Sequence, residues 1–222
     1  MKALIFVSPG RCGTRRLAEL LKEKLPNEFT VKHQMRFSRA ANVIGNVMYH
    51  FGQSEKIKEK LYYLIVSNYV NNRYFISCDP LTAMIIPQKW IESDNVSIVQ
   101  ITRDPGSFAD SFLQFSREKM KSMVAHNLIP CWQIGVYPFE NFFSRNKIKK
   151  KYKYICKLKE NFFEMHYSSN PNYFKVDMNR LYKDDFLEQL LDYSFQYHIS
   201  ITKHDLSIRK NQTKKRFNFE II

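Results

Sequence analysis

Apolar blocks alternate with amphipathic segments along the chain, and this pattern predicts strands separated by helices. Strands are predicted over residues 3–7, 29–33, 74–78, 96–101 and 173–177, and the first of these is an apolar run typical of a buried strand. Between them, apolar residues recur at helical spacing. The helices are expected around 17–21, over about 38–50, 55–70, 107–123, 146–168 and 183–196, and around Trp90. The alternation predicts an α/β fold: a central, mainly parallel sheet with helices on both faces.

The first predicted strand enters a helix through a loop that is rich in glycine and arginine. Residues 8–16 read SPGRCGTRR. The two glycines allow the backbone to approach a phosphate, and the free N–H groups of the first helical turn point at it. Each arginine near an exposed helix N-terminus costs up to about 1 kcal/mol, which a bound anion would remove. The sequence predicts a P-loop-like anion site formed by Gly10, Arg11, Cys12, Gly13, Thr14, Arg15 and Arg16.

Two other interpretations of this loop follow from its residues. It is not a Walker A motif, because that motif requires a lysine before the Ser or Thr and Thr14 follows a glycine. Short glycine motifs also match by chance. An ordinary strand-to-helix turn with surface arginines is therefore the alternative.

A second candidate anion site follows the fourth predicted strand. Arg103 leaves the end of that strand, and Ser111 lies about two turns into the next helix. An arginine and a hydroxyl that meet in this way can hold one phosphate through charge-assisted hydrogen bonds. The alternative is that Asp104 caps the helix while Arg103 and Ser111 are surface residues. Ligands of parallel sheets bind beyond the carboxyl ends of the strands, where the sequence also places His33 and Asp79.

Together, the two stretches resemble the cofactor-binding motifs of PAPS-dependent sulfotransferases, whose sulfuryl donor is 3′-phosphoadenosine 5′-phosphosulfate. In that family a strand-loop-helix with a Gly-Thr core wraps the 5′-phosphosulfate, which residues 10–14 match. A later strand ends in Arg, with Ser eight residues on, and binds the 3′-phosphate, which Arg103 and Ser111 match. Residues 175–181 resemble the family's late strand and the loop that follows it. Residues 207–211 resemble its C-terminal basic loop, which implies that Arg209 and Lys210 also reach the 3′-phosphate.

The resemblance implies a single sulfotransferase-like domain over residues 1–222. It implies in-line transfer of a sulfuryl group from PAPS to a hydroxyl or amine of a carbohydrate or small molecule, without a metal. Arg11 stands where many members have Lys, and its high pKa makes it a source of electrostatic stabilisation and not an acid. Cys12 stands where the family often has Ser or Gly, and it is expected to pack against the loop.

A catalytic base for this reaction has two candidates. Sulfuryl transfer to a hydroxyl needs a group that takes the proton. Related carbohydrate sulfotransferases have a glutamate in the region of His33, where this chain has no carboxylate, so His33 is the first candidate. Asp79 is the second. The alternatives are that His33 is a hydrogen-bonded residue at a strand end and that Asp79 caps a helix beginning near Thr82.

Net charge and aromatic residues leave the acceptor open. A net charge of +14 implies an anionic partner. The basic run 147–153 suits an acidic or glycan acceptor, or is a solvated helix face. Residues 126–143 are expected to form an irregular loop or lid. Its aromatic residues would line an acceptor pocket or the core of that loop; they are Trp132, Tyr137, Phe139, Phe142 and Phe143.

Two rival functions fit the sequence less well. A P-loop nucleotide kinase or hydrolase is disfavoured by the missing Walker lysine and by the lack of a clear Mg-binding aspartate. A non-enzymatic nucleic-acid-binding protein is disfavoured because no RNA-binding motif accompanies the positive charge. Four widely spaced cysteines without metal spacing predict reduced thiols. Met1-Lys2 leads straight into the first strand, and no apolar run reaches the length of a membrane span. A cytoplasmic location is therefore expected.

Overall fold

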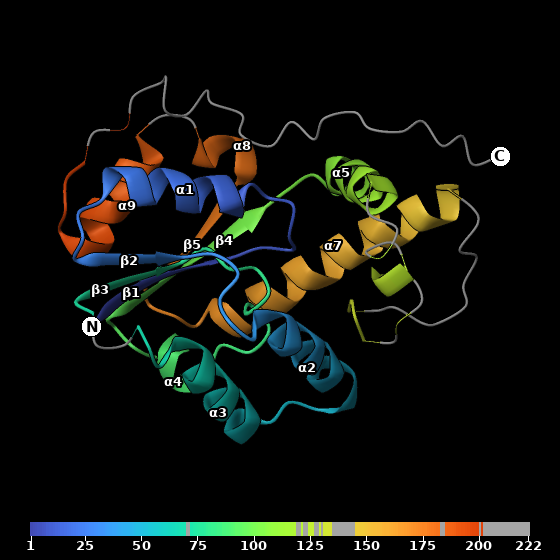
Figure 1. Cartoon of the computed structure of the whole chain (residues 1–222), viewed down its shortest axis with the longest axis horizontal. Coiled ribbons are helices and arrows are strands. Elements are labelled where there is room, and N and C mark those ends of the chain that lie inside the picture. The colour runs from blue at the N-terminus through green and yellow to red at the C-terminus, as the bar shows by residue number, and fades with distance from the viewer. Residues whose placement is uncertain are drawn as a thin grey trace.

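The computed structural model describes residues 1–69, 72–118, 121, 124–126, 129, 131–134, 145–182, 185–199 and 201. The predicted strands form one five-stranded sheet in the order β2-β3-β1-β4-β5, and every neighbouring pair is parallel (Figure 1). The strands are β1 (Lys2–Val7), β2 (Phe29–Lys32), β3 (Tyr74–Ser77), β4 (Val96–Thr102) and β5 (Tyr173–Asp177). The predicted α/β class and the parallel sheet are confirmed.

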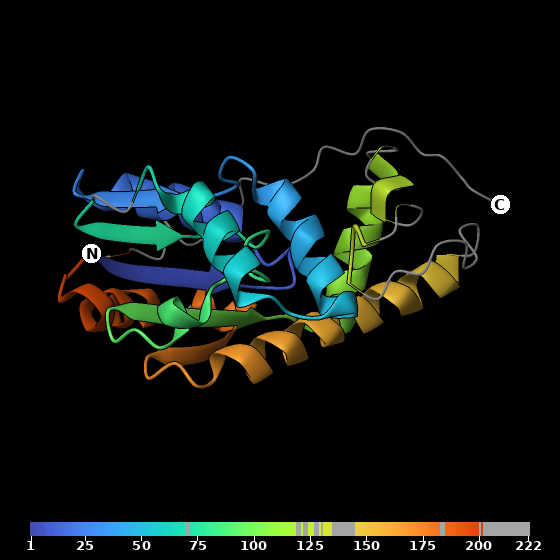
Figure 2. The ribbon, with the colours of Figure 1, turned by 90° about the horizontal axis from the view of Figure 1, so that it is seen from below.

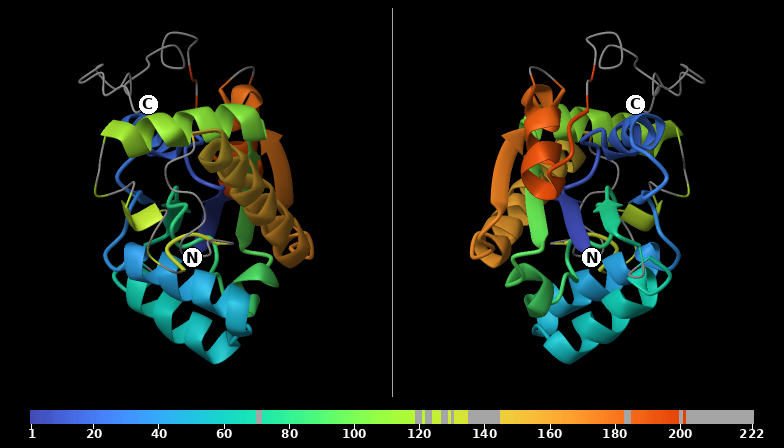
Figure 3. Two further views of the ribbon diagram at one scale, coloured as in Figure 1. Left: turned by 90° about the vertical axis from the view of Figure 1, so that its right-hand side faces the viewer. Right: turned by 90° about the vertical axis from the view of Figure 1, so that its left-hand side faces the viewer.

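Helices cover both faces of the sheet (Figures 1 and 3). One face carries α1 (Thr14–Lys24), α8 (Met178–Leu181) and α9 (Phe186–Phe195). The other carries α2 (Ser38–Phe51), α3 (Glu55–Val66), α4 (Gln88–Ile91) and part of α7 (Arg145–Tyr167). The helix α5 (Pro105–Glu118) lies beyond the carboxyl ends of the strands and packs against α7 (Figure 2).

Two hydrophobic cores result, one on each face of the sheet. Along β1, Ile5 and Val7 face the core beneath α2 and α3, whereas Leu4 and Phe6 face the core beneath α1 and α9. All four side chains are at most 1% exposed, and burying each contributes roughly 1.5–3 kcal/mol. The strand reads as a continuous apolar run because both of its sides are buried. This burial fixes the end of β1, where the glycine- and arginine-rich loop begins.

Two departures from the expected helices lie near the candidate site residues. The segment after Asp79 forms turns, so the helix expected near Thr82 is absent from this described stretch. In contrast, α5 begins at Pro105, two residues before the predicted start, as proline is well suited to the first position of a helix. Asp104 caps it, because its carboxylate Oδ2 accepts a hydrogen bond of 2.7 Å from the Ser107 N–H.

The four cysteines are free thiols, and three of them are buried. Among the described residues, no helix combines the length and the apolar character that crossing a bilayer requires.

Candidate functional site

The loop between β1 and α1 is built on left-handed backbone. Gly10, Arg11 and Gly13 have φ angles of 98°, 57° and 73°. Glycine adopts this conformation without cost, whereas a non-glycine residue such as Arg11 is held there only by its surroundings. Turns of this kind direct successive N–H groups toward one point and form anion-binding concavities. The loop backbone therefore has the character that the sequence predicts for a phosphate site.

Side chains from the loop and from Tyr182, the residue after α8, hold this backbone in place. The Cys12 thiol donates to the Gly10 carbonyl at 3.1 Å, and the Ser8 hydroxyl accepts from the Gly10 N–H at 3.3 Å. The Tyr182 hydroxyl donates to the Gly13 carbonyl at 2.8 Å. Burial raises the pKa of the Cys12 thiol to about 12, so it stays protonated. Cys12 packs against the loop, as expected, and is no nucleophile.

The two predicted anion motifs meet at Arg11. Its Nε donates to the Ser111 hydroxyl at 3.3 Å, across 100 residues of sequence. Its guanidinium also lies over the Phe115 ring, 4.8 Å from the ring centre. An Nη of Arg103 donates to the Arg11 backbone carbonyl. The loop before α1, the residue after β4 and one face of α5 thus border a single site.

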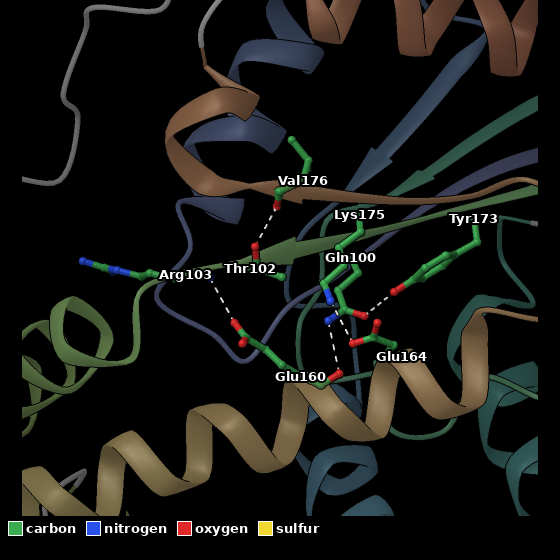
Figure 4. A network of polar contacts seen from close by, with 8 residues as sticks. All are labelled: Gln100, Thr102, Arg103, Glu160, Glu164, Tyr173, Lys175 and Val176. Atoms are coloured by element: carbon green, nitrogen blue, oxygen red, sulfur yellow. Dashed lines mark hydrogen bonds and ion pairs between the residues drawn. The ribbon is translucent and has the colours of Figure 1, made fainter.

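The backbone of Arg103 is anchored from beneath by α7. Its N–H donates to Oε1 of Glu160 at 3.0 Å, while its side chain extends away from that carboxylate (Figure 4). Burial raises the pKa of Glu160. The Nε of Arg103 is buried and has no hydrogen-bond partner among the described residues. A buried N–H without a partner costs about 1–3 kcal/mol, which points to an acceptor that a ligand supplies.

The other two arginines of the loop motif turn toward α1 and the residue after α8. Arg15 forms an ion pair of 3.1 Å with Glu19 on the exposed side of α1. Arg16 lies over the Tyr182 ring, 4.8 Å from its centre. Both residues belong to the first turn of α1, so their backbone N–H groups lie at the predicted site even though their guanidinium groups contact other side chains.

His33, which directly follows β2, lies beside the start of α1. Its Nε2 is 3.4 Å from the Thr14 hydroxyl. The imidazole is half-buried, and this burial lowers the pKa of His33, with Arg15 and Lys22 lowering it further. It is therefore neutral at neutral pH and able to accept a proton. The structure brings this candidate base to the anion loop.

Asp79 is placed differently. It is 1% exposed, and its carboxylate accepts from the backbone N–H groups of Met35 at 2.8 Å and Leu81 at 3.0 Å. Burial raises the pKa of Asp79. Its contacts join the end of β3 to the backbone two residues beyond His33. This geometry is that of a residue that fixes the His33 loop.

Three residues of the site carry no recognisable motif in the sequence. Glu160 and Tyr182 make the contacts described above, and Lys159 donates to the carbonyl of Pro9 at 3.4 Å. Of these three, only the position of Lys159 could have been inferred from the sequence, because it lies at helical spacing from Tyr152, Ile155 and Phe163, which are all buried on α7.

Several predicted residues fall outside the described part of the chain. Arg209 and Lys210 are among them, as are the aromatic residues Tyr137, Phe139, Phe142 and Phe143. Trp132 is described: its ring lies 6.4 Å from that of His126, and its carbonyl accepts from the side chains of Asn42 and Asn46 at 3.1 Å.

Comparison with known proteins supports the fold. Among solved structures, the chain is similar to a sulfotransferase from Alicyclobacillus acidocaldarius. The two share 8% sequence identity with a TM-score of 0.51, over 96% of this chain and 87% of that chain. No protein-family model and no curated protein sequence matches the chain. At this identity the similarity concerns the fold: the chain has a sulfotransferase-like arrangement of strands and helices.

Proposed function

We propose that this chain is a sulfotransferase that takes a sulfuryl group from PAPS. The observation that carries the proposal is the hydrogen bond between Arg11 and Ser111, with Arg103 bonded to the Arg11 carbonyl. Residues 10–14 match the family's motif for the 5′-phosphosulfate, and Arg103 with Ser111 match its motif for the 3′-phosphate of the same cofactor. Their meeting at a loop with anion-binding backbone fits a single donor site. The sulfotransferase-like fold supports the same conclusion.

The residues present fit such a donor. The N–H groups of loop 8–14 and the N-terminus of α1 suit the 5′-phosphosulfate. Arg103 and Ser111 suit the 3′-phosphate, and the buried Nε of Arg103 offers a donor that the described protein leaves unpaired. When bound, PAPS supplies the sulfuryl group that is transferred. Arg209 and Lys210 would add positive charge at the 3′-phosphate, as the family resemblance implies.

Arg11 and His33 divide the chemical work in this proposal. Arg11 is exposed at the loop, and its permanent positive charge offsets negative charge that builds up on the leaving phosphate. His33 is neutral because burial lowers its pKa, so it accepts the proton of the acceptor hydroxyl or amine. Asp79 is the alternative base. With both oxygens bonded to backbone N–H groups, it is better suited to holding the His33 loop.

The acceptor is proposed to be a carbohydrate or another small molecule with a hydroxyl or amine. The exposed lysines of the basic run 147–153 on α7 favour an acceptor that carries negative charge. They lie on the same helix that anchors Arg103 through Glu160, which supports an acceptor site along α7.

Transfer of radioactive sulfur tests the proposed function. The protein is incubated with sulfur-35 PAPS and a panel of sugars, glycans, phenols and amines, and labelled products are separated. We expect label in at least one acceptor, with PAP released in equal amount, and loss of both with Arg11→Ala. Phosphate release from ATP without any sulfuryl transfer would contradict the proposal in favour of a nucleotide hydrolase.

A further inference from the structure

Lys159 is a lysine buried beneath the anion loop. It lies on α7 and is 5% exposed, within the same buried face as Tyr152, Ile155 and Phe163. Its Nζ donates to the carbonyl of Pro9, at the start of the loop, over a long distance of 3.4 Å. The ammonium thus sits against the backbone that turns from β1 into the anion site.

The fold leaves this charge poorly compensated. A buried ammonium is costly unless it is paired and fully hydrogen-bonded. No carboxylate of the described part of the chain forms an ion pair with Lys159. The adjacent carboxylate, Glu160, instead accepts from the backbone of Arg103. Burial lowers the pKa of Lys159 to about 8, which reflects the missing negative partner.

A second buried donor at the same loop lacks a partner. The Nε of Arg103 is fully buried without an acceptor among the described residues, while an Nη of the same side chain holds the Arg11 carbonyl. Lys159 and Arg103 therefore each donate to a backbone carbonyl of loop 8–14, one at Pro9 and the other at Arg11. Two incompletely satisfied cationic side chains at one loop indicate that the site is completed by an anion.

We propose that Lys159 is the buried cation of the anion site, and that its ammonium pairs with the anionic group bound at loop 8–14. The loop lacks the lysine of a Walker A motif, and on this proposal α7 supplies an ammonium to the same loop from below. Charges interact more strongly in the protein interior than at the surface. Lys159 therefore contributes more to anion affinity than the exposed Arg15. The inference rests on the proposed function, whose donor it describes in more detail.

Proton uptake on binding distinguishes this role from simple packing. An anion beside Lys159 raises its pKa from about 8, so at pH 8 the protein takes up as much as about half a proton per ligand. The titratable groups that interact with Lys159 are Cys12, Cys156 and His126, and Glu160 is its neighbour in sequence. Burial raises the pKa of both thiols, that of Cys12 to about 12, and lowers the pKa of His126 to about 4, so none of the three titrates near pH 8. Phosphate groups, with a second pKa of about 6, are fully ionised there.

The experiment is calorimetric titration of PAP and of ADP at pH 8 in two buffers that differ in ionisation enthalpy. Lys159→Met is compared with the unmodified protein, with Lys159→Arg, and with Lys157→Met, which changes an exposed lysine on the same helix. We expect Lys159→Met to lose the proton uptake and to bind PAP about tenfold or more weakly. Lys159→Arg should keep most of the affinity without the uptake, and Lys157→Met should match the unmodified protein.

Thermal unfolding without ligand completes the test. Lys159→Met removes the cost of burying the charge but leaves the Pro9 carbonyl without its donor, so the variant should melt close to the temperature of the unmodified protein. Unchanged PAP affinity and proton uptake in Lys159→Met would overturn the inference and leave the proposed function intact. Proton uptake that persists in Lys159→Arg would also overturn it. Equal binding of ADP and PAP, with uptake that depends on Lys159, would support the inference and contradict the proposed donor. No binding of either ligand would overturn both.

Discussion

Gly13 is held to glycine by two separate constraints. Its φ angle of 73° is left-handed, and a Cβ at this position would lie 2.8 Å from the Tyr182 hydroxyl. The hydroxyl cannot simply move away, because it donates to the Gly13 carbonyl. The glycine that precedes α1 in the proposed anion site is therefore also the residue that fixes the contact between the loop and Tyr182.

Replacement of Gly13 by alanine should destabilise the protein more than Gly10→Ala in the same loop. Gly10 also has a positive φ, 98°, but a Cβ there meets nothing within 4 Å. A positive φ costs an L side chain about 1–3 kcal/mol in both variants, and only Gly13→Ala adds the clash. Urea unfolding measures the difference in free energy of unfolding. Equal losses in the two variants would contradict the contact with Tyr182.

His33 is expected to determine the acid limb of the pH profile. Because its pKa lies below the ordinary value, the imidazole is neutral at pH 7, and turnover should fall only when acidification protonates it, below about pH 6.5. His33→Ala should reduce turnover by about 10²–10⁴-fold and leave PAP affinity near normal. His198→Ala is the control, because its side chain is 87% exposed. Normal turnover in His33→Ala, with Asp79→Asn inactive yet still binding PAP, would assign the base to Asp79.

At the scale of elements, Asp79 joins the end of β3 to the segment after β2. Its two carboxylate oxygens accept from the Met35 and Leu81 N–H groups. Asp79→Asn replaces one acceptor oxygen by an NH₂ group, so one buried N–H loses its partner. We expect the free energy of unfolding to fall by about 1–3 kcal/mol, with turnover reduced and PAP affinity retained. Calorimetry and chemical unfolding check this separation; a loss of PAP affinity alone would contradict it.

The elements themselves follow from local patterns. The central strands β1, β3 and β4 were predictable from their apolar runs because both sides of a central parallel strand are buried. The edge strands β2 and β5 are only partly buried. The segment after Asp79 forms turns in place of the helix expected near Thr82. The Asp79 carboxylate also accepts from Met35, 44 residues earlier, and such a long-range contact has no local signature. The turn in loop 8–14 could also be predicted locally, because glycine favours the positive φ angles that Gly10 and Gly13 adopt.

Side-chain contacts between distant elements could not be predicted from the sequence. Arg15 and Arg16 were expected at the anion site, and their position at the helix start was right. Their guanidinium directions depend on Glu19 and Tyr182. The burial of Lys159 was not predicted, because a lysine within a basic helix is usually exposed to water. Its helical spacing from Tyr152 and Ile155, which are buried on the same helix, indicates that it shares their buried face.

For the whole molecule, the fold alone does not decide the function. The same architecture serves many reactions, and the sulfotransferase of similar fold shares 8% identity with this chain. The proposed activity therefore depends on the specific chemistry at the sheet edge. Its most specific part is the 3′-phosphate site of Arg103 and Ser111, because a kinase or hydrolase of the P-loop type has no need to recognise that phosphate.

The comparison of PAP with ADP tests this central claim most directly. Calorimetry should show that PAP binds about 10–150-fold more tightly than ADP, corresponding to about 1.5–3 kcal/mol for charge-assisted contacts to the extra phosphate. Ser111→Ala should remove part of that difference by weakening PAP and leaving ADP unchanged. Equal affinity for PAP and ADP in the unmodified protein would contradict the assignment of Arg103 and Ser111, and with it the proposal that PAPS is the donor.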